Sequence, residues 1–122
     1  MSCTASIRKN RDVAIVDLSG RFTAGPATGV IREAVAGLLK AGELNIILNL
    51  ADVTYLDSAA GIGELVASYI STRKVGGHVK LLRPGRNVQN VLHIVRLDRV
   101  FETYGDEDEA IRSFGQQSFT AS

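Results

Sequence analysis

Short, mostly apolar runs alternate along the chain with longer stretches in which apolar residues recur at helical spacing. Val13–Leu18 and Leu44–Leu50 belong to the first kind, and their composition is typical of strands in the interior of a sheet. Residues 27–41, 61–74 and 87–95 belong to the second kind, which carries its apolar side chains along one helical face. This alternation predicts strands separated by amphipathic helices.

Shorter segments complete the predicted order of elements. Ser6–Arg8 reads as a first strand, which the polar residues 9–12 join by a turn to the next strand. Val79–Leu82 and Val100–Tyr104 are two further short strands. A last helix covers residues 106–114, where an acidic start is followed by apolar positions.

Glycine, proline and short polar residues mark the predicted helix boundaries. Pro26 suits the first position of a helix, and Gly42 and Gly76 stand where the first two helices end. Asn87 is placed to cap the third helix. Asp106 and the acidic residues after it have the spacing of a capping box and complement the dipole of the last helix.

The predicted order is ββαβαβαβα. Strands separated by helices must mostly pair in parallel, because the chain has to cross back to the same end of the sheet. We therefore expect an α/β fold: a central, mostly parallel or mixed sheet of four to five strands with about four helices, and one early strand antiparallel at an edge. The 122 residues fit a single domain over 1–122, with a core at about 6–114 and a flexible tail at 115–122.

Composition narrows the class of protein. Hydrophobic residues make up 45% and charged residues 22% of the chain, which excludes a disordered or collagen-like protein. No apolar run approaches the roughly 20 residues of a membrane-spanning helix, so we expect no direct membrane insertion. The first ten residues contain no apolar signal core, and the single cysteine, Cys3, cannot form an intramolecular disulfide. We therefore expect a cytoplasmic protein.

Charge and ligand-forming residues exclude other classes. The net charge of +1 provides no strong field for nucleic acid or an anionic membrane. Two histidines and one cysteine are too few for a soft-metal site, so we expect no metal and no cofactor. Four arginines around the third predicted helix would form either a basic patch or an ordinary solvated face; they are Arg83, Arg86, Arg96 and Arg99.

Residues 54–65 form the segment richest in candidate chemistry, which we expect to be a loop running into the second helix. It follows a buried strand, and binding sites in open α/β sheets form beyond the carboxyl ends of strands. Its small residues would let another molecule approach the backbone. Asp57 and Ser58 supply a carboxylate beside a hydroxyl, and one of them would also serve as the helix cap.

Enzymatic interpretations of this segment lack support. Gly61-Ile62-Gly63 is only a fragment of a dinucleotide fingerprint, and no P-loop sequence is present. Ser58 would need a base to act as a nucleophile, and neither His78 nor His93 is placed to reach it. The expected site therefore contains no catalytic residue, and a small nucleotide-binding α/β protein remains an alternative of another class.

Several stretches together resemble one family. Leu48–Ser58, running into Gly61–Val66, is similar to the STAS domain of bacterial anti-sigma factor antagonists. Leu18–Phe22, the glycines Gly76-Gly77 and Leu97–Phe101 before an acidic helix also match. The resemblance covers essentially residues 6–114, and the family's fold agrees with the predicted order of elements.

The resemblance implies a protein switch of transcription and not an enzyme. Members of the family bind an anti-sigma factor and thereby release the sigma factor that it holds. The anti-sigma factor is often a serine protein kinase with a histidine-kinase-like ATP site, which phosphorylates the antagonist in the loop that corresponds to residues 57–61. On this basis Ser58 is the candidate phosphorylation site, and the candidate partner-binding residues are Asp57, Ser58, Ala59, Ala60, Gly61 and Ile62.

One departure from the family concerns this loop. The family usually reads Asp-Ser-Ser/Thr-Gly, with the acceptor directly before the glycine, whereas this chain is one residue longer and has Ala60 at that position. Ser58 is the only hydroxyl between Tyr55 and Ser68. Either Ser58 is the acceptor in a shifted loop, or the protein is not phosphorylated in the usual way. The second case favours an alternative, an accessory subunit of a membrane lipid-transport complex.

Overall fold

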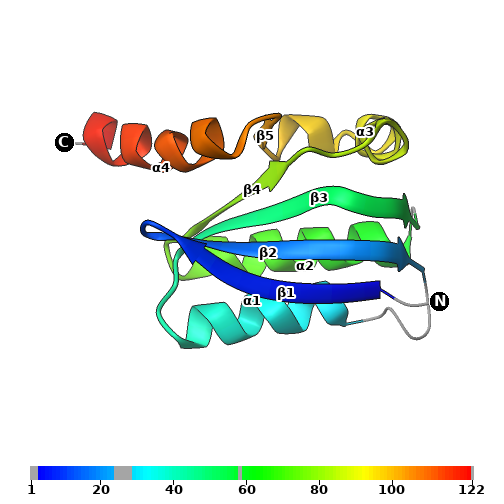
Figure 1. Ribbon diagram of the computed structural model, residues 1–122, viewed down its shortest axis with the longest axis horizontal. Coiled ribbons are helices and arrows are strands. Elements are labelled where there is room, and N and C mark those ends of the chain that lie inside the picture. Colours follow the sequence, from blue (N-terminus) through cyan, green and yellow to red (C-terminus); the bar gives the residue numbers. More distant parts are fainter. Residues whose placement is uncertain (1–2, 24–28, 58, 122) are drawn as a thin grey trace.

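The computed structural model describes residues 3–23, 29–57 and 59–121, with side chains described up to residue 115. Within these residues, strands and helices follow in the predicted order (Figure 1). The strands are β1 (Cys3–Asn10), β2 (Val13–Phe22), β3 (Asn45–Leu56), β4 (His78–Leu82) and β5 (Thr103–Tyr104). The helices are α1 (Val30–Lys40), α2 (Ala60–Lys74), α3 (Arg86–Ile94) and α4 (Glu107–Ala121), with a short 3-10 helix, η1 (Leu97–Arg99).

The strands form one mixed sheet in the order β1-β2-β3-β4-β5. β1 lies at an edge and pairs antiparallel with β2, whereas β2, β3, β4 and β5 pair in parallel. The α/β fold, the mixed sheet and the antiparallel early strand are therefore confirmed. The parallel order also places the carboxyl ends of β2 and β3 together, at the end of the sheet where α2 begins.

Alternate residues of the central strands point to opposite faces of the sheet. On one face, Val16 of β2 and Leu48 of β3 belong to the main core with α1 and α2, and α3 adds Leu92 to it. On the other face, Ile15 and Ile47 meet α4 in a smaller core. Figure 1 shows α1 and α2 behind the sheet, with α3 and α4 along its β4–β5 side. Both faces of the central strands are thus covered, which explains their continuous apolar runs.

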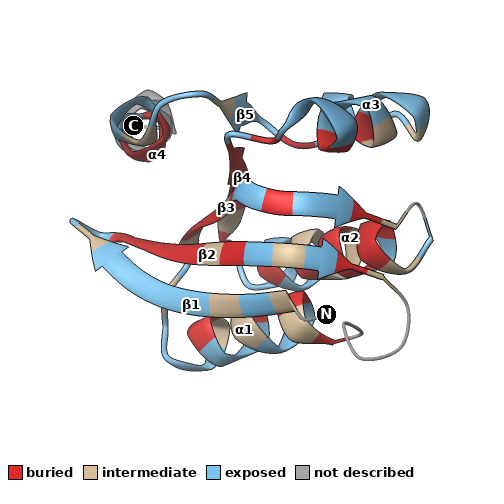
Figure 2. Cartoon of the chain, turned by 45° about the vertical axis from the view of Figure 1, so that its right-hand side comes forward, coloured by how far each residue is buried: buried red, intermediate tan, exposed pale blue. Residues whose placement is uncertain are grey.

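The first three strands are longer than predicted, and the predicted loop at 54–56 is wrong. β1 covers residues 3–10, β2 continues to Phe22, and β3 continues to Leu56, paired with β2 through register shifts. The carboxyl-terminal halves of these strands carry many exposed side chains, such as Thr54 and Tyr55 (Figure 2, pale blue). Their polar composition reads as a loop in the sequence, although the backbone remains paired.

The buried face of α2 also differs from the prediction. Ile62 and Leu65 are buried as expected, but Ile70 is 50% exposed. Ser68 and Thr72 are buried instead, and the Thr72 hydroxyl donates to the Ser68 carbonyl oxygen at 2.8 Å. Small and polar side chains on the interior face let α2 pack against the sheet beside α1, and hydrophobicity alone does not identify such a face.

Some of the predicted helix-capping and helix-ending residues have the expected role. Gly42 and Gly76 have left-handed φ angles of 85° and 83°, as expected for residues that end a helix. Asn87 lies inside α3 and does not cap it, because the N-cap is Gly85. Asp106 does cap α4, since its Oδ2 accepts the backbone N–H of Glu109 at 3.0 Å. The expected role of Pro26 lies outside the described residues.

The carboxyl-terminal third shows two further differences. β5 covers only Thr103–Tyr104 and not the predicted 100–104, because η1 occupies the chain just before it. α4 continues to Ala121, past the predicted end near Phe114. Gly115, the residue after the predicted end, is helical.

Candidate functional site

The candidate site lies where β3 ends and α2 begins. The Asp57 carboxylate oxygen Oδ1 accepts the backbone N–H groups of Ala59 at 2.7 Å and Ala60 at 2.8 Å. These bonds satisfy amides at the start of α2 that lack an intrahelical partner, so Asp57 caps the helix from two residues before its N-cap position, Ala59. The same bonds, from Ala60 first and Ala59 second, lower the pKa of Asp57 below its ordinary value. Asp57 is therefore a carboxylate at neutral pH.

Backbone hydrogen bonds fix this entrance to the sheet. The Asp57 N–H donates to the Phe22 carbonyl oxygen at 2.9 Å, which ties the end of β3 to the end of β2. The Ile62 N–H donates to the Asp57 carbonyl oxygen at 3.1 Å, a span one residue wider than a regular α-helical bond. This bond joins the first turn of α2 to the end of β3.

Gly61 serves close packing. A Cβ atom at this position would lie 2.7 Å from Leu56 Cδ1 and 3.2 Å from the Phe22 carbonyl oxygen. Gly63, by contrast, has nothing within 4 Å of such an atom. The first glycine therefore lets α2 approach the strand ends, as helix–sheet packing requires.

A buried carboxylate connects the start of α1 to α2. Glu64 of α2 is 6% exposed, and its oxygens accept the backbone N–H groups of Gly29 at 2.7 Å, Ile31 at 3.1 Å and Arg32 at 3.1 Å. Arg32 Nε lies 3.4 Å from Glu64 Oε2. One side chain of α2 thus caps α1, where a negative charge also meets the positive end of the helix dipole. This arrangement brings the start of α1 to the same end of the sheet as Asp57.

An exposed aromatic–cation pair lies beside the entrance to α2. Arg21 of β2 and Tyr55 of β3 are paired in register, and the Arg21 guanidinium carbon lies 4.7 Å from the centre of the Tyr55 ring. Tyr55 is 38% exposed and Arg21 is exposed. The pair offers an apolar ring and a positive charge to solvent, which are the features of residues that dominate binding at protein interfaces.

The predicted site residues differ in accessibility. Ala59 is exposed, and Asp57 and Ala60 are partly exposed, so these three residues form surface. Gly61 and Ile62 are buried and support the surface from below. Ser58 lies outside the described residues, and its assignment as the phosphate acceptor stays a prediction.

The other candidate side chains form no group with Asp57 among the described residues. His78 starts β4, beside the start of β3 and so at the opposite end of the sheet, with Nδ1 3.2 Å from Arg73 Nη1, and its pKa is lowered, mainly by burial. His93 is in the last turn of α3 and pairs with Asp98 at 2.9 Å. Cys3 starts β1 and pairs with Gly20, so the antiparallel register places it, partly buried, at the same end of the sheet as Asp57 but two strands away from β3.

The arginines around α3 are divided between two places. Arg83 Nε donates to the Gly105 carbonyl oxygen at 3.1 Å, and Arg86 starts α3. Arg96 and Arg99 follow the other end of α3, where they border a surface depression with the exposed Ile94. The structure therefore does not form one basic patch from all four.

The described residues offer neither a metal-binding cluster nor a membrane-spanning helix. Over residues 3–23, 29–57 and 59–121, no group of three or more His, Cys, Asp or Glu side chains is arranged to hold a metal ion. Within the same described residues, no helix combines the length and the hydropathy needed to cross a bilayer.

Arg21, Tyr55 and Glu64 are site residues that the sequence prediction missed. Arg21 and Tyr55 belong to segments predicted to lie outside strands, so their cross-strand pairing was not visible. Glu64 did carry a signal, because a charge falls between the apolar positions Ile62 and Leu65 on the predicted helix. Its partner, the start of α1, is distant in sequence and only the fold brings it near.

Residues 4–110 match the family model of the STAS domain. The chain therefore belongs to the STAS domain family, as its motifs indicate.

Solved structures with the same fold include three bacterial proteins. An anti-sigma factor antagonist from Mycobacterium paratuberculosis has 21% identity and a TM-score of 0.80, with 92% of this chain and 93% of that chain covered. Thermotoga maritima TM1081 has 24% identity and a TM-score of 0.76, with 89% and 92% covered. The Bacillus cell fate determinant SpoIIAA, solved in its phosphorylated form, has 21% identity and a TM-score of 0.69, with 91% and 99% covered.

Proposed function

We propose that this protein is an anti-sigma factor antagonist, a regulator and not an enzyme. It binds an anti-sigma factor and so releases the sigma factor that the anti-sigma factor holds. The contact surface is the α2 entrance, which we define as Arg21, Tyr55, Asp57, Ala59 and Ala60. Membership of the STAS family and the antagonists among the structural neighbours support this function.

The observation that carries the proposal is the construction of the α2 entrance. Ala59 is exposed and small, and its backbone N–H is fixed by Asp57 at 2.7 Å. A partner can therefore approach the helix start closely. The Arg21–Tyr55 pair, 4.7 Å apart, adds an aromatic and a cationic anchor at the margin.

The first prediction tests this surface with Ala59→Arg. The larger charged side chain would separate a partner that docks on the helix start, so we expect affinity for a purified kinase-type anti-sigma factor to fall at least tenfold, or about 1.4 kcal/mol. Ala41→Arg is the matched control, because Ala41 is an exposed alanine at the far end of α1. Isothermal titration calorimetry measures both, and equal affinities for the two variants would contradict the proposed surface.

We further propose that phosphorylation of Ser58 by the anti-sigma factor, acting as a serine kinase with a histidine-kinase-like ATP site, switches binding off in the cytoplasm. A phosphate adds about −1.5 to −2 charges at neutral pH. The start of α2 tolerates such a charge through its dipole, whereas a partner packed on Ala59 and Ala60 would have to desolvate it beside the Asp57 carboxylate. SpoIIAA, solved in phosphorylated and unphosphorylated forms, provides a structural precedent.

The second prediction concerns this switch. Ser58→Asp is expected to weaken partner binding with little change in melting temperature, and Ser58→Ala is expected to bind constitutively. Ser71→Asp is the control, since Ser71 is exposed on α2 away from its start. Incubation with the kinase and ATP, followed by peptide mass spectrometry, locates the phosphate. Full modification of Ser58→Ala at another residue would show that Ser58 is the wrong acceptor.

A second candidate function is favoured by Ala60, which stands at the usual acceptor position. In that case the protein is an accessory subunit of a membrane lipid-transport complex and binds its ATPase subunit without being phosphorylated. Calorimetry with the purified ATPase subunit distinguishes the two functions: binding there, with no binding to an anti-sigma factor, selects the transport role.

A further inference from the structure

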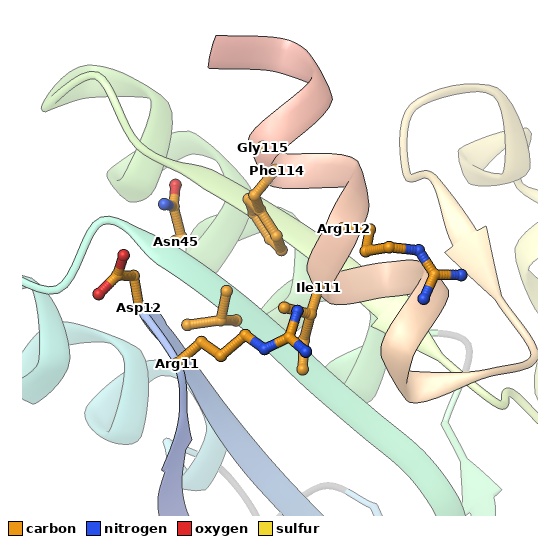
Figure 3. A pocket seen from close by; sticks show the side chains of 8 residues that line it. Arg11, Asp12, Asn45, Ile111, Arg112, Phe114 and Gly115 are labelled. Atoms are coloured by element: carbon orange, nitrogen blue, oxygen red, sulfur yellow. The ribbon is translucent and has the colours of Figure 1, made fainter. Parts of the chain in front are cut away.

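A cavity of about 450 Å³ lies at the opposite end of the sheet from the α2 entrance. It opens between the β1–β2 turn, the start of β3 and α4 (Figure 3). Its volume is within the range of small-molecule sites, which is roughly 300–1,000 Å³. None of the residues of the α2 entrance lines it, so it is a separate feature of the molecule.

The floor of the cavity is apolar. Val13 of β2 and Ile111 and Phe114 of α4 line it, and they are 2%, 6% and 4% exposed. All three belong to the smaller core between the sheet and α4, so the floor is held by packing on both sides. A ligand would meet a preformed apolar surface and would not have to order it.

The rim of the cavity carries more positive than negative charge. Arg11 and Arg112 border it, together with one carboxylate, Asp12, and the amide of Asn45. Within the described part of the chain, neither guanidinium has an ion pair or a side-chain hydrogen bond. Figure 3 shows Arg11 reaching from the β1–β2 turn toward Ile111 of α4, whereas Arg112 points away from the cavity. The Arg11 guanidinium at the rim is suited to a carboxylate or a similar anion.

The backbone of Arg11 adds to this picture. Arg11 has a φ of 58°, a left-handed conformation that turns usually assign to glycine, asparagine or aspartate. Arg11 is therefore not the residue type that this turn favours, but it places a long cationic side chain at the mouth of the cavity. Arg83 and Arg96 are left-handed as well, with φ angles of 52° and 68°, so the location of Arg11 at the cavity is what distinguishes it.

We propose that this cavity binds a small amphipathic organic anion, whose apolar body lies against Val13, Ile111 and Phe114 and whose anionic group pairs with Arg11. The site is independent of the proposed partner-binding function. A ligand bound here would also stabilise the packing of α4 on the sheet, because it contacts both.

The test titrates the ¹⁵N-labelled full chain with octanoate, with octanol and octylamine as matched probes of the apolar and charge contributions. Octanoate is expected to give saturable amide shift changes confined to residues 11–13, 45 and 111–115. Octanol is expected to bind more weakly and octylamine not to bind. Equal binding of octanol or octylamine, dispersed shift changes, or no saturable change with octanoate would each overturn the proposal.

Two variants test the charge recognition. Arg11→Gln is expected to weaken octanoate binding roughly three- to tenfold, since it removes a charge-assisted contact from an exposed side chain and leaves the floor intact. Arg96→Gln makes the same charge change at an exposed residue away from the cavity, with a similar left-handed backbone, and is expected to leave binding unchanged. Equal effects of the two variants would mean that only net charge matters and would refute the assignment of Arg11. Circular dichroism confirms that both variants are folded.

Discussion

Gly61 and Gly63 lie one residue apart in the first turns of α2 and have different physical roles. A side chain at Gly61 would meet Leu56 Cδ1 at 2.7 Å and the backbone oxygen of Phe22 at 3.2 Å. The strand ends cannot move away, because the Asp57 N–H is bonded to that same oxygen at 2.9 Å. Gly63 faces open space and contributes only the flexibility of glycine within a helix.

The third prediction compares Gly61→Ala with Gly63→Ala. Gly61→Ala is expected to destabilise the protein by about 1–3 kcal/mol through overpacking. Gly63→Ala is expected to stabilise it by roughly 0.5–1 kcal/mol, because alanine loses less backbone entropy in a helix. Urea denaturation of the two variants measures both free energies of unfolding. A stabilising Gly61→Ala would mean that α2 does not rest on the strand ends as described.

At the scale of single residues, the sequence predicts what depends on near neighbours. Asp57 is identifiable as a cap because the amides that donate to it, those of Ala59 and Ala60, follow within three residues. The packing role of Gly61 is not identifiable, because Phe22 comes from a distant strand. The same Gly-x-Gly pattern therefore permits a phosphate-binding interpretation until its surroundings are known.

At the scale of elements, α1 and α2 are joined by a polar contact as well as by the main core. Glu64 supplies the acceptors for three backbone N–H groups at the start of α1. Hydrophobic spacing predicts both helices because it reports which face is buried. It does not report the partner of a buried charge, and it fails for the end of β3, where exposed residues up to Tyr55 resemble a loop although the strand is paired.

The fourth prediction concerns Glu64→Ala. Removing the carboxylate leaves the N–H groups of Gly29 and Ile31 without acceptors next to the core, and we expect a loss of about 2–3 kcal/mol in the free energy of unfolding. Glu33→Ala is the control, since Glu33 is an exposed glutamate in the first turn of α1, the helix that Glu64 caps. This substitution should lower the free energy of unfolding by less than about 1 kcal/mol. Chemical denaturation gives both values, and similar losses for the two variants would contradict the capping role of Glu64.

At the scale of the whole molecule, an ionic network joins the first strand to the last helix. Arg8 of β1 donates to Asp17 of β2 at 2.6 Å and to Glu107 of α4 at 2.8 Å. Asn10 donates to Glu107 at 2.9 Å, and Asn49 of β3 donates to Asp17 at 2.8 Å. The sequence predicts the elements that carry these groups but not this network, since Arg8 and Glu107 meet only after the sheet has ordered and α4 has docked on it.

The fifth prediction follows from the pKa of Glu107. The Arg8 guanidinium, and after it the Asn10 amide, lower this pKa from 4.5 to about 2. The unfolded chain therefore binds the proton more readily, so the stabilisation is fully present above pH 4.5 and is lost as the pH falls toward 2. Because Arg8 is 42% exposed and screened by solvent, we expect a contribution of about 1 kcal/mol. Thermal unfolding from pH 7 to pH 2 measures this contribution.

Glu107→Gln should flatten the acid limb of the curve of stability against pH. Asp108→Asn, an exposed neighbour in the same helix turn, is the control and should leave the slope of that limb unchanged. Identical curves for the wild type and Glu107→Gln would show that the ionic network does not stabilise the packing of α4 on the sheet.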